Sequence, residues 1–406
     1  MVPSQLAALR LTHYARAALI LLTLAAFATE HLVHYPMAVM TLWGAVDFVR
    51  SRPRERQGGW VLGLFALLWL PQLASLPDAA NRTHSLETTL AYVHFLPVAY
   101  FVWRAASTRR VYRLVTLGAA CLLGFVILDA FAQLIWRVDL FGYPPRGGSL
   151  TGVFHPKQRL GVCLAVFAPL LIDVVWRGCR RWPWLWLVYL PSAIVLAMSL
   201  KRVAWMMLAV GVCGYALTRW RRSAAGRAGL AWRGALVVSV AGVLVMQLPA
   251  FDTRVAQTRD IVSKDFDAMD AASAYRLSLW RTAADIAREH WVNGIGPRGF
   301  RHAYAAHAPA DDFWLARNGT GQTHPHLFAL EVAAETGVIG LAAYAAFYLA
   351  LVRLWWRAGR PLPVWLLASL VATLPLNAHH AFYGSYWASL YWLVLAIGLA
   401  ETRPAR

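Results

Sequence analysis

The chain has little charge and few cysteines for its length. Only 15% of its 406 residues are charged, whereas 59% are hydrophobic. A soluble protein of this size needs more polar surface, so the composition excludes that class and indicates that the bilayer is the solvent. The four cysteines all lie outside the one long hydrophilic segment, which excludes a disulfide framework and a cysteine-based metal site: Cys121, Cys163, Cys179 and Cys213.

Long apolar runs recur along the whole chain. Each has the roughly 17–25 residues that a helix needs to cross the hydrocarbon core, and none alternates as the strands of a membrane barrel do. We therefore expect an all-α polytopic membrane protein of about twelve transmembrane helices, near 14–30, 32–49, 60–77, 87–103, 112–135, 160–176, 184–200, 203–218, 231–250, 338–356, 362–380 and 384–401. We interpret the first run as a retained helix, because no clear small-residue cleavage site precedes a soluble domain.

The chain has a formal net charge of +19, and the distribution of its basic residues indicates the membrane topology. Basic residues concentrate in short loops at every second helix end, around 50–56, 104–113, 177–181, 219–233 and 353–360, and at both termini. The positive-inside rule makes those loops and termini cytoplasmic, and this distribution argues against a nucleic-acid-binding face. We expect three parts: helices one to nine in 1–250, a large outward loop in 251–325, and helices ten to twelve in 326–406.

The outward loop contains two local signals. Residues 271–290 have the pattern of an amphipathic helix, with Asp270 or Ser273 as its N-cap. Residues 294–299 read Gly-Ile-Gly-Pro-Arg-Gly and match the dinucleotide fingerprint literally. No strand precedes them, so we predict a tight turn instead.

His326 is the strongest candidate for a general base. Pro325 suits the first position of a helix, with Thr323 or His324 as its cap, so we predict that His326 lies in the first turn. The positive end of the helix dipole disfavours an imidazolium and leaves a neutral ring that accepts a proton. The alternative is a capping histidine without chemistry. The spacing of the two histidines is not that of zinc ligands on a helix, and we expect no metal.

Three cations have no acidic neighbour nearby in the sequence. Arg276 has none three or four residues away, and Lys201 and Arg202 occupy the outward tip of a hairpin in a region, 184–218, without Asp or Glu. A cation at the membrane interface without a carboxylate is costly and usually marks function. Arginine binds phosphate bidentately, so the pattern predicts a diphosphate clamp beside a neutral base. Lipid-headgroup anchoring is the alternative.

These motifs resemble the O-antigen ligase / O-antigen polymerase family of bacterial envelope glycosyltransferases. Thr-His-Pro-His-Leu at 323–327, followed by Glu-Thr-Gly-Val-Ile-Gly at 335–340, is similar to the family's histidine motif. Residues 199–205 and 276–280, the latter followed by the glycine turn, resemble its two arginine motifs. Residues 152–159 match its first-half loop only loosely, and Leu327 stands where the family commonly has Asn, Ser or Gln.

The resemblance implies a GT-C-type enzyme with its active site on the periplasmic side of the inner membrane. It implies inverting transfer of a glycan from undecaprenyl diphosphate to a sugar hydroxyl of lipid A–core, without metal or cofactor. Arg276 and Arg202 would neutralise the departing diphosphate, and His326 would take the proton of the hydroxyl. The expected substrate-binding residues are Lys201, His324, Arg298, Lys157 and Arg159. An O-antigen polymerase, a protein O-oligosaccharyltransferase and a transporter of lipid-linked glycans are the alternatives.

Overall fold

The computed structural model describes residues 3–50, 58–221, 266–358 and 362–402. Throughout these ranges the regular structure is helical, and no strand is present. The predicted ninth span, 231–250, and the first residues of the outward loop, 252–265, lie outside the described residues.

The helices follow one another with short connections in most places. Their bounds are α1 Pro3–Ala26, α2 His34–Arg50, α3 Gly58–Ala74, α4 Arg82–Tyr92, α5 Phe95–Ala106, α6 Arg109–Trp136, α7 Leu160–Gly178, α8 Tyr189–Met198, α9 Arg202–Trp220, α12 Phe266–Ala272, α13 Arg276–Glu289, α14 Phe300–His307, α15 Phe313–Asn318, α16 Phe328–Arg357, α17 Val364–Ala372 and α18 Ser385–Glu401. Two 3₁₀ turns, Gly152–Phe154 and Pro183–Val188, precede α7 and α8.

Every predicted span within the described residues overlaps a helix, but two of the spans are not continuous helices. The span at 87–103 is divided between α4 and α5, because Pro97 has no N–H for the Val93 carbonyl and its ring clashes with that group. The span at 362–380 ends early, since α17 stops at Ala372. Pro375 disfavours helix at the residue before it, and its carbonyl accepts from the Ala329 N–H at 3.1 Å.

Among the described helices, α6, α7, α9 and α16 are long and apolar enough to cross a membrane. Only 33% of the most apolar window of α6 is buried within the protein, and Leu117, Leu128 and Ile135 are exposed on it. Such a broad apolar surface is expected where lipid surrounds a helix. The chain is thus a helical protein with membrane-spanning character, and a total of twelve spans remains a prediction.

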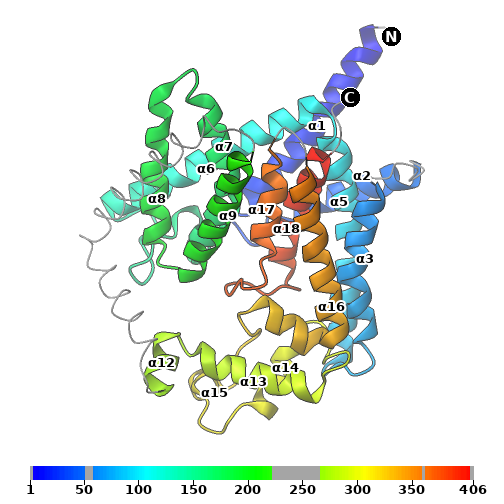
Figure 1. Cartoon of the computed structure of the whole chain (residues 1–406), viewed down its shortest axis with the longest axis vertical. Helices are drawn as coiled ribbons and strands as arrows, with labels where there is room; N and C mark the ends of the chain where they lie inside the picture. The colour runs from blue at the N-terminus through cyan, green and yellow to red at the C-terminus, as the bar shows by residue number, and fades with distance from the viewer. Residues whose placement is uncertain (1–2, 51–57, 222–265, 359–361, 403–406) are drawn as a thin grey trace.

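Helix α18 lies at the centre of the bundle. It packs against α5 and α17, α17 packs against α7, and α7 packs against α9. Helix α16 packs against α3 on one side, and α13 packs against the beginning of α16. Figure 1 shows α12 to α15 gathered at the end of the molecule opposite the start of α1 and the end of α18. This arrangement places the outward-loop helices beside the first residues of α16.

The loop helix predicted at 271–290 is present as α13, but it begins later, at Arg276, and residues 271–272 belong to the end of α12. The chain breaks after α12, where Ala274 and Tyr275 have positive φ. Asp270 Oδ1 accepts from the Leu277 N–H at 2.8 Å, and Ser273 Oγ accepts from the Arg276 N–H at 2.9 Å. Both candidate caps therefore satisfy the first N–H groups of α13, and a new helix begins there instead of continuing.

The glycine turn predicted at 294–299 is present and packs against a kink in α16. Gly337 has φ 62° and ψ −160°, and a Cβ there would lie 2.3 Å from the Val292 carbonyl oxygen. A Cβ on Gly294 would lie 2.4 Å from the backbone of Glu335. The Val338 N–H donates to the Trp291 carbonyl at 2.8 Å, and the Ile295 N–H donates to Ala334 at 3.0 Å. The two glycines permit this close approach of two backbones.

Candidate functional site

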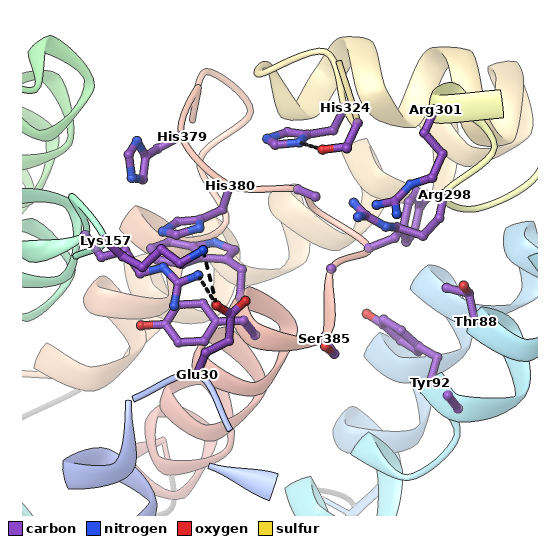
Figure 2. A pocket seen from close by; sticks show the side chains of 18 of the residues that line it. Glu30, Thr88, Tyr92, Lys157, Arg298, Arg301, His324, His379, His380 and Ser385 are labelled. Carbon is purple, nitrogen blue, oxygen red and sulfur yellow. Dashed lines mark hydrogen bonds and ion pairs between the residues drawn. The ribbon is translucent and has the colours of Figure 1, made fainter. Parts of the chain in front are cut away.

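A cavity of about 770 Å³ opens between α4, the connection before α7, the glycine turn and the segment before α18 (Figure 2). This volume is in the range of small-molecule binding sites. Its wall is strongly basic, with Glu30 as its acidic residue and five cationic residues from two parts of the chain: Arg146, Lys157, Arg159, Arg298 and Arg301. The cavity therefore suits an anionic ligand.

One group of cations lies beside Glu30. Arg159 Nη2 is 3.2 Å from the Glu30 carboxylate, and its guanidinium lies 3.8 Å from the ring centroid of Tyr386. Lys157 Nζ is 3.7 Å from the same carboxylate. Burial acts to raise the pKa of Glu30, but the charges of Arg159 and Lys157 outweigh it and lower the pKa. The Arg159 side chain is 12% exposed and that of Lys157 is 57% exposed, so Arg159 is the more tightly held of the two.

The second group of cations is Arg298, in the glycine turn, and Arg301, at the start of α14. Arg298 has φ 62°, and its N–H donates to Glu335 Oε2 at 2.7 Å. The Phe300 N–H donates to the other oxygen of Glu335 at 3.4 Å. Within the described part of the chain, Arg298 Nη1 and Arg301 Nε are buried and have no hydrogen-bond partner. The glycine turn and the start of α14 thus each present one guanidinium group to the cavity, while Glu335 holds the backbone between them.

Four histidines gather next to these cations, and burial keeps them neutral. It lowers the pKa of His324, His379 and His380 well below the usual value. Burial and then the charge of Arg276 lower the pKa of His326 to about 4. The rings of His324 and His326 lie 4.0 Å apart, and His380 stacks on Trp387 at 4.4 Å.

His326 does not occupy the predicted first turn of a helix. Helix α16 begins at Phe328, with Leu327 as its N-cap, and His326 has φ 53°. The helix begins there because the N–H groups of Phe328 and Ala329 donate to backbone carbonyls before α18, at 3.1 Å each. His326 is also not the capping residue. Its neutral state arises from burial and Arg276, whereas we had expected it from the helix dipole.

Helix α13 and the tip before α9 place the other cations around His326. Arg276 is the first residue of α13, and the Trp280 Nε1–H of that helix donates to the Pro325 carbonyl at 3.0 Å. The charge of Lys201 also lowers the pKa of His326, and Lys201 Nζ donates to Gln158 Oε1 at 2.6 Å.

Arg202 lies at the start of the neighbouring helix. It is the first residue of α9, and its Nη2 donates to the Ala272 carbonyl at 2.5 Å. This bond ties α9 to the end of α12, four residues before Arg276.

The eight predicted site residues fall into two sets. His324, Arg298, Lys157 and Arg159 line the cavity. His326, Arg276, Arg202 and Lys201 are not part of its wall. The two sets are joined by His379, which lines the cavity and whose pKa is lowered by burial and then by Lys201, His326, Arg276 and Arg159.

Sequence reasoning missed several residues of the site. Glu30, Arg301, His379 and His380 line the cavity, and Glu331 accepts from the Phe382 N–H at 3.0 Å, which holds the segment beside His380. Glu331 and Glu335 are four residues apart in an otherwise apolar helix. This pair of carboxylates could have indicated a functional site from the sequence, because buried carboxylates in a membrane-spanning segment are costly and usually mark function.

The described residues also contain one grouping with the spacing of metal ligands. It comprises Glu289, His290 and His307, which are not part of the cavity wall.

One family model matches part of the chain. Residues 187–345 match the family described as O-antigen ligase. This part of the chain is therefore similar to the O-antigen ligase family. This family covers both ligases and polymerases, which are membrane glycosyltransferase-like enzymes. No curated protein matches the chain.

The matched residues include Arg202, Arg276, Arg298 and His326. They therefore include the candidate base and the cations of α9, α13 and the glycine turn. Arg301 also lies within the match, whereas the three other cations of the cavity wall come from the connection before α7, outside it: Arg146, Lys157 and Arg159.

Proposed function

We propose that the protein is an O-antigen ligase. It transfers polysaccharide from undecaprenyl diphosphate to a sugar hydroxyl of lipid A–core, with inversion and without a metal or cofactor. The observation that carries the proposal is the neutral His326, with a pKa of about 4, beside Arg276 and next to a basic cavity of about 770 Å³. The polyprenyl chain of the donor and the acyl chains of lipid A would occupy the bilayer beside the helices.

In the proposed reaction the acceptor hydroxyl attacks the anomeric carbon of the donor sugar. The carbon–oxygen bond to the diphosphate breaks, and undecaprenyl diphosphate leaves with the bonding electrons. Arg276 and Arg202, with the arginines of the cavity wall, neutralise the charge on this leaving group. His326 takes the proton of the hydroxyl.

Binding of the donor also makes His326 a stronger base. The charge of Arg276 and burial hold its pKa low in the free enzyme. A diphosphate beside Arg276 offsets that positive charge and raises the pKa toward neutrality, where general-base catalysis is most effective.

The proposed topology has twelve spans, both termini in the cytoplasm and the site on the periplasmic side of the inner membrane. The three parts are 1–250, 251–325 and 326–406. The positions of the start of α1 and the end of α18, opposite α12 to α15, support this orientation (Figure 1). The site would therefore open at the outer leaflet, where lipid-linked donor and lipid A–core meet.

An O-antigen polymerase is the second candidate, because the same family covers both activities. It would use the same donor and a lipid-linked glycan as acceptor. A protein O-oligosaccharyltransferase would need a polypeptide acceptor. A transporter is less well supported, since the neutral histidine and the cations gather around one cavity at the outward-loop end of the bundle.

The test mixes purified protein with undecaprenyl-diphosphate-linked glycan, with and without lipid A–core, and resolves the products by size. A ligase places glycan on lipid A–core. Longer lipid-linked glycans formed without lipid A–core would replace this proposal with a polymerase. The absence of any covalent product would leave the transporter as the remaining account.

A further inference from the structure

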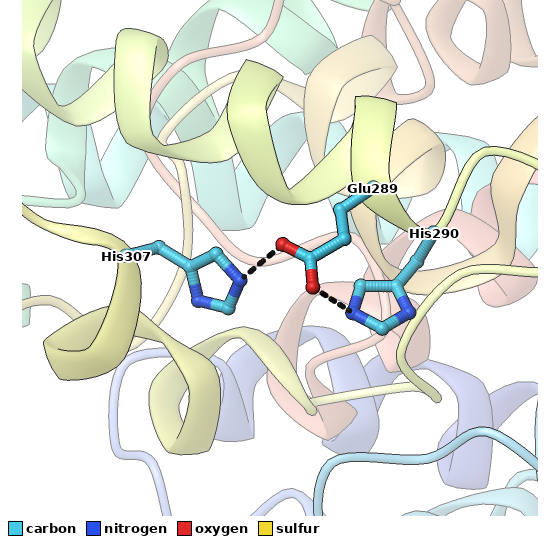
Figure 3. Close-up of side chains that lie close together, drawn as sticks. All are labelled: Glu289, His290 and His307. Carbon is cyan, nitrogen blue, oxygen red and sulfur yellow. Dashed lines mark hydrogen bonds and ion pairs between the residues drawn. The ribbon is translucent and has the colours of Figure 1, made fainter.

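A second group of chemistry-bearing side chains lies on the outward-loop helices, away from the cavity wall. Glu289 is the last residue of α13, His290 follows it, and His307 is the last residue of α14. Their ligand atoms all lie within 4.8 Å of one another (Figure 3). His307 faces one oxygen of the Glu289 carboxylate and His290 faces the other (Figure 3).

The hydrogen bonds of His307 determine which ring nitrogen faces Glu289. His307 Nδ1 is 2.8 Å from the Ala303 carbonyl oxygen, which only accepts, so Nδ1 carries a proton. His307 Nε2 lies 3.1 Å from Glu289 Oε2. In a neutral ring that nitrogen has a lone pair, and a lone pair facing a carboxylate oxygen is repulsive. A proton or a metal ion between the two atoms removes this repulsion.

The arrangement matches that of a metal-binding histidine. A ligating imidazole usually donates its other N–H to a backbone carbonyl or carboxylate, which fixes its tautomer and orientation. The third member, His290 Nε2, lies 3.8 Å from Glu289 Oε1. Zinc ligands at about 2.0–2.1 Å in a tetrahedron are about 3.3 Å from one another. The separation of His307 from Glu289 is already close to this value, and the ligand atoms, which all lie within 4.8 Å of one another, need shifts of at most about 1.5 Å.

We infer that Glu289, His290 and His307 form a binding site for a borderline divalent cation of the Zn²⁺ class. Two imidazoles and one carboxylate are a ligand set that suits zinc, with the fourth position left to water. The side chains of His307 and His290 are 20% and 33% exposed, so an ion reaches them from solvent.

The bound ion would fix the end of α14 to the end of α13. These helices already share an apolar contact through Ile286, Phe300 and Tyr304. Between them runs the glycine turn that carries Arg298, so the ion would stiffen the support of the cavity wall. The site is structural: it lies outside the cavity, and its occupancy is independent of whether the protein is a ligase or a polymerase.

The experiment uses the purified full-length protein in detergent after removal of metal by a chelator. Zn²⁺ is titrated by calorimetry, and Co²⁺ is added separately to record the absorption of a tetrahedral site. We expect one Zn²⁺ per chain and a melting temperature that rises with its concentration. Because loss of an outer partner alone costs about 10- to 100-fold in affinity, His307→Ala and Glu289→Gln should each weaken binding at least about tenfold.

His302→Gln is the matched control, since it removes another histidine of α14 that instead pairs with His84. It should bind Zn²⁺ as the unaltered protein does. Glu289 is 63% exposed, so Glu289→Gln gives a folded variant even if His307→Ala does not. The inference is overturned if the unaltered protein binds no metal, if binding survives both substitutions, or if His302→Gln abolishes it.

Discussion

Substitution of Gly337 by alanine tests the packing that positions the glycine turn. Gly337 has φ 62° and ψ −160°, a region open essentially to glycine alone, and the new Cβ would lie 2.3 Å from the Val292 carbonyl oxygen. The backbone must move by about 1 Å, which breaks the bonds that Val338 and Ile339 donate to Trp291 and Val292. The strained conformation costs about 1–3 kcal/mol and each lost hydrogen bond about 1 kcal/mol. The expected loss of stability is therefore about 3–5 kcal/mol.

Substitutions at two further glycines separate the cost of backbone strain from the cost of the close contact at Gly337. Gly319→Ala places a Cβ at φ 73° in open space, so it should cost only the conformational strain of about 1–2 kcal/mol. Gly124→Ala lies in α6 with no atom within 4 Å, so it should be neutral or slightly stabilising. Thermal unfolding followed by the fluorescence of the 20 tryptophans measures all three variants. Equal melting temperatures for Gly337→Ala and Gly319→Ala would refute the close backbone approach.

The cavity and the proposed base give three further predictions. The kcat/KM of transfer should stay level from pH 8 to about pH 5 and fall as the pH drops through about 4. The reason is that the depressed pKa of His326 keeps the base neutral above that value. A midpoint near 6.5 in a pH-rate profile would contradict this. Arg159→Lys should raise KM for the donor about tenfold or more, since lysine lacks the planar group that lies over Tyr386. Lys157→Ala should raise the KM for the donor less than about threefold, because the Lys157 side chain is 57% exposed. If steady-state kinetics showed a larger rise in KM for Lys157→Ala than for Arg159→Lys, Arg159 would not belong to the donor site.

The helices could be predicted from the sequence because their signals are local. Apolar runs gave the positions of α6, α7, α9 and α16, and Asp270 and Ser273 were identified as caps from residue type. The resemblance of the histidine and arginine motifs to the O-antigen ligase family is confirmed by the match at 187–345.

Features that depend on tertiary contacts were not predictable in the same way. The first residue of α16 is determined by carbonyls of the segment before α18, which a local helix signal does not contain. The cavity wall combines Glu30, Arg159, Arg298 and His380, which are brought together only by the packing of the bundle. The break at 273–275 also escaped prediction, because it depends on the positive φ of Ala274 and Tyr275, two residue types that do not signal such a backbone.

The most direct test of the account is transfer of glycan to lipid A–core by His326→Ala under single-turnover conditions, with donor binding measured in parallel. His13→Ala, in α1, is the control. The account predicts that His326→Ala binds the lipid diphosphate normally and transfers glycan about 10²- to 10⁴-fold more slowly, as expected for loss of a general base. Transfer at the unaltered rate by His326→Ala would contradict the account.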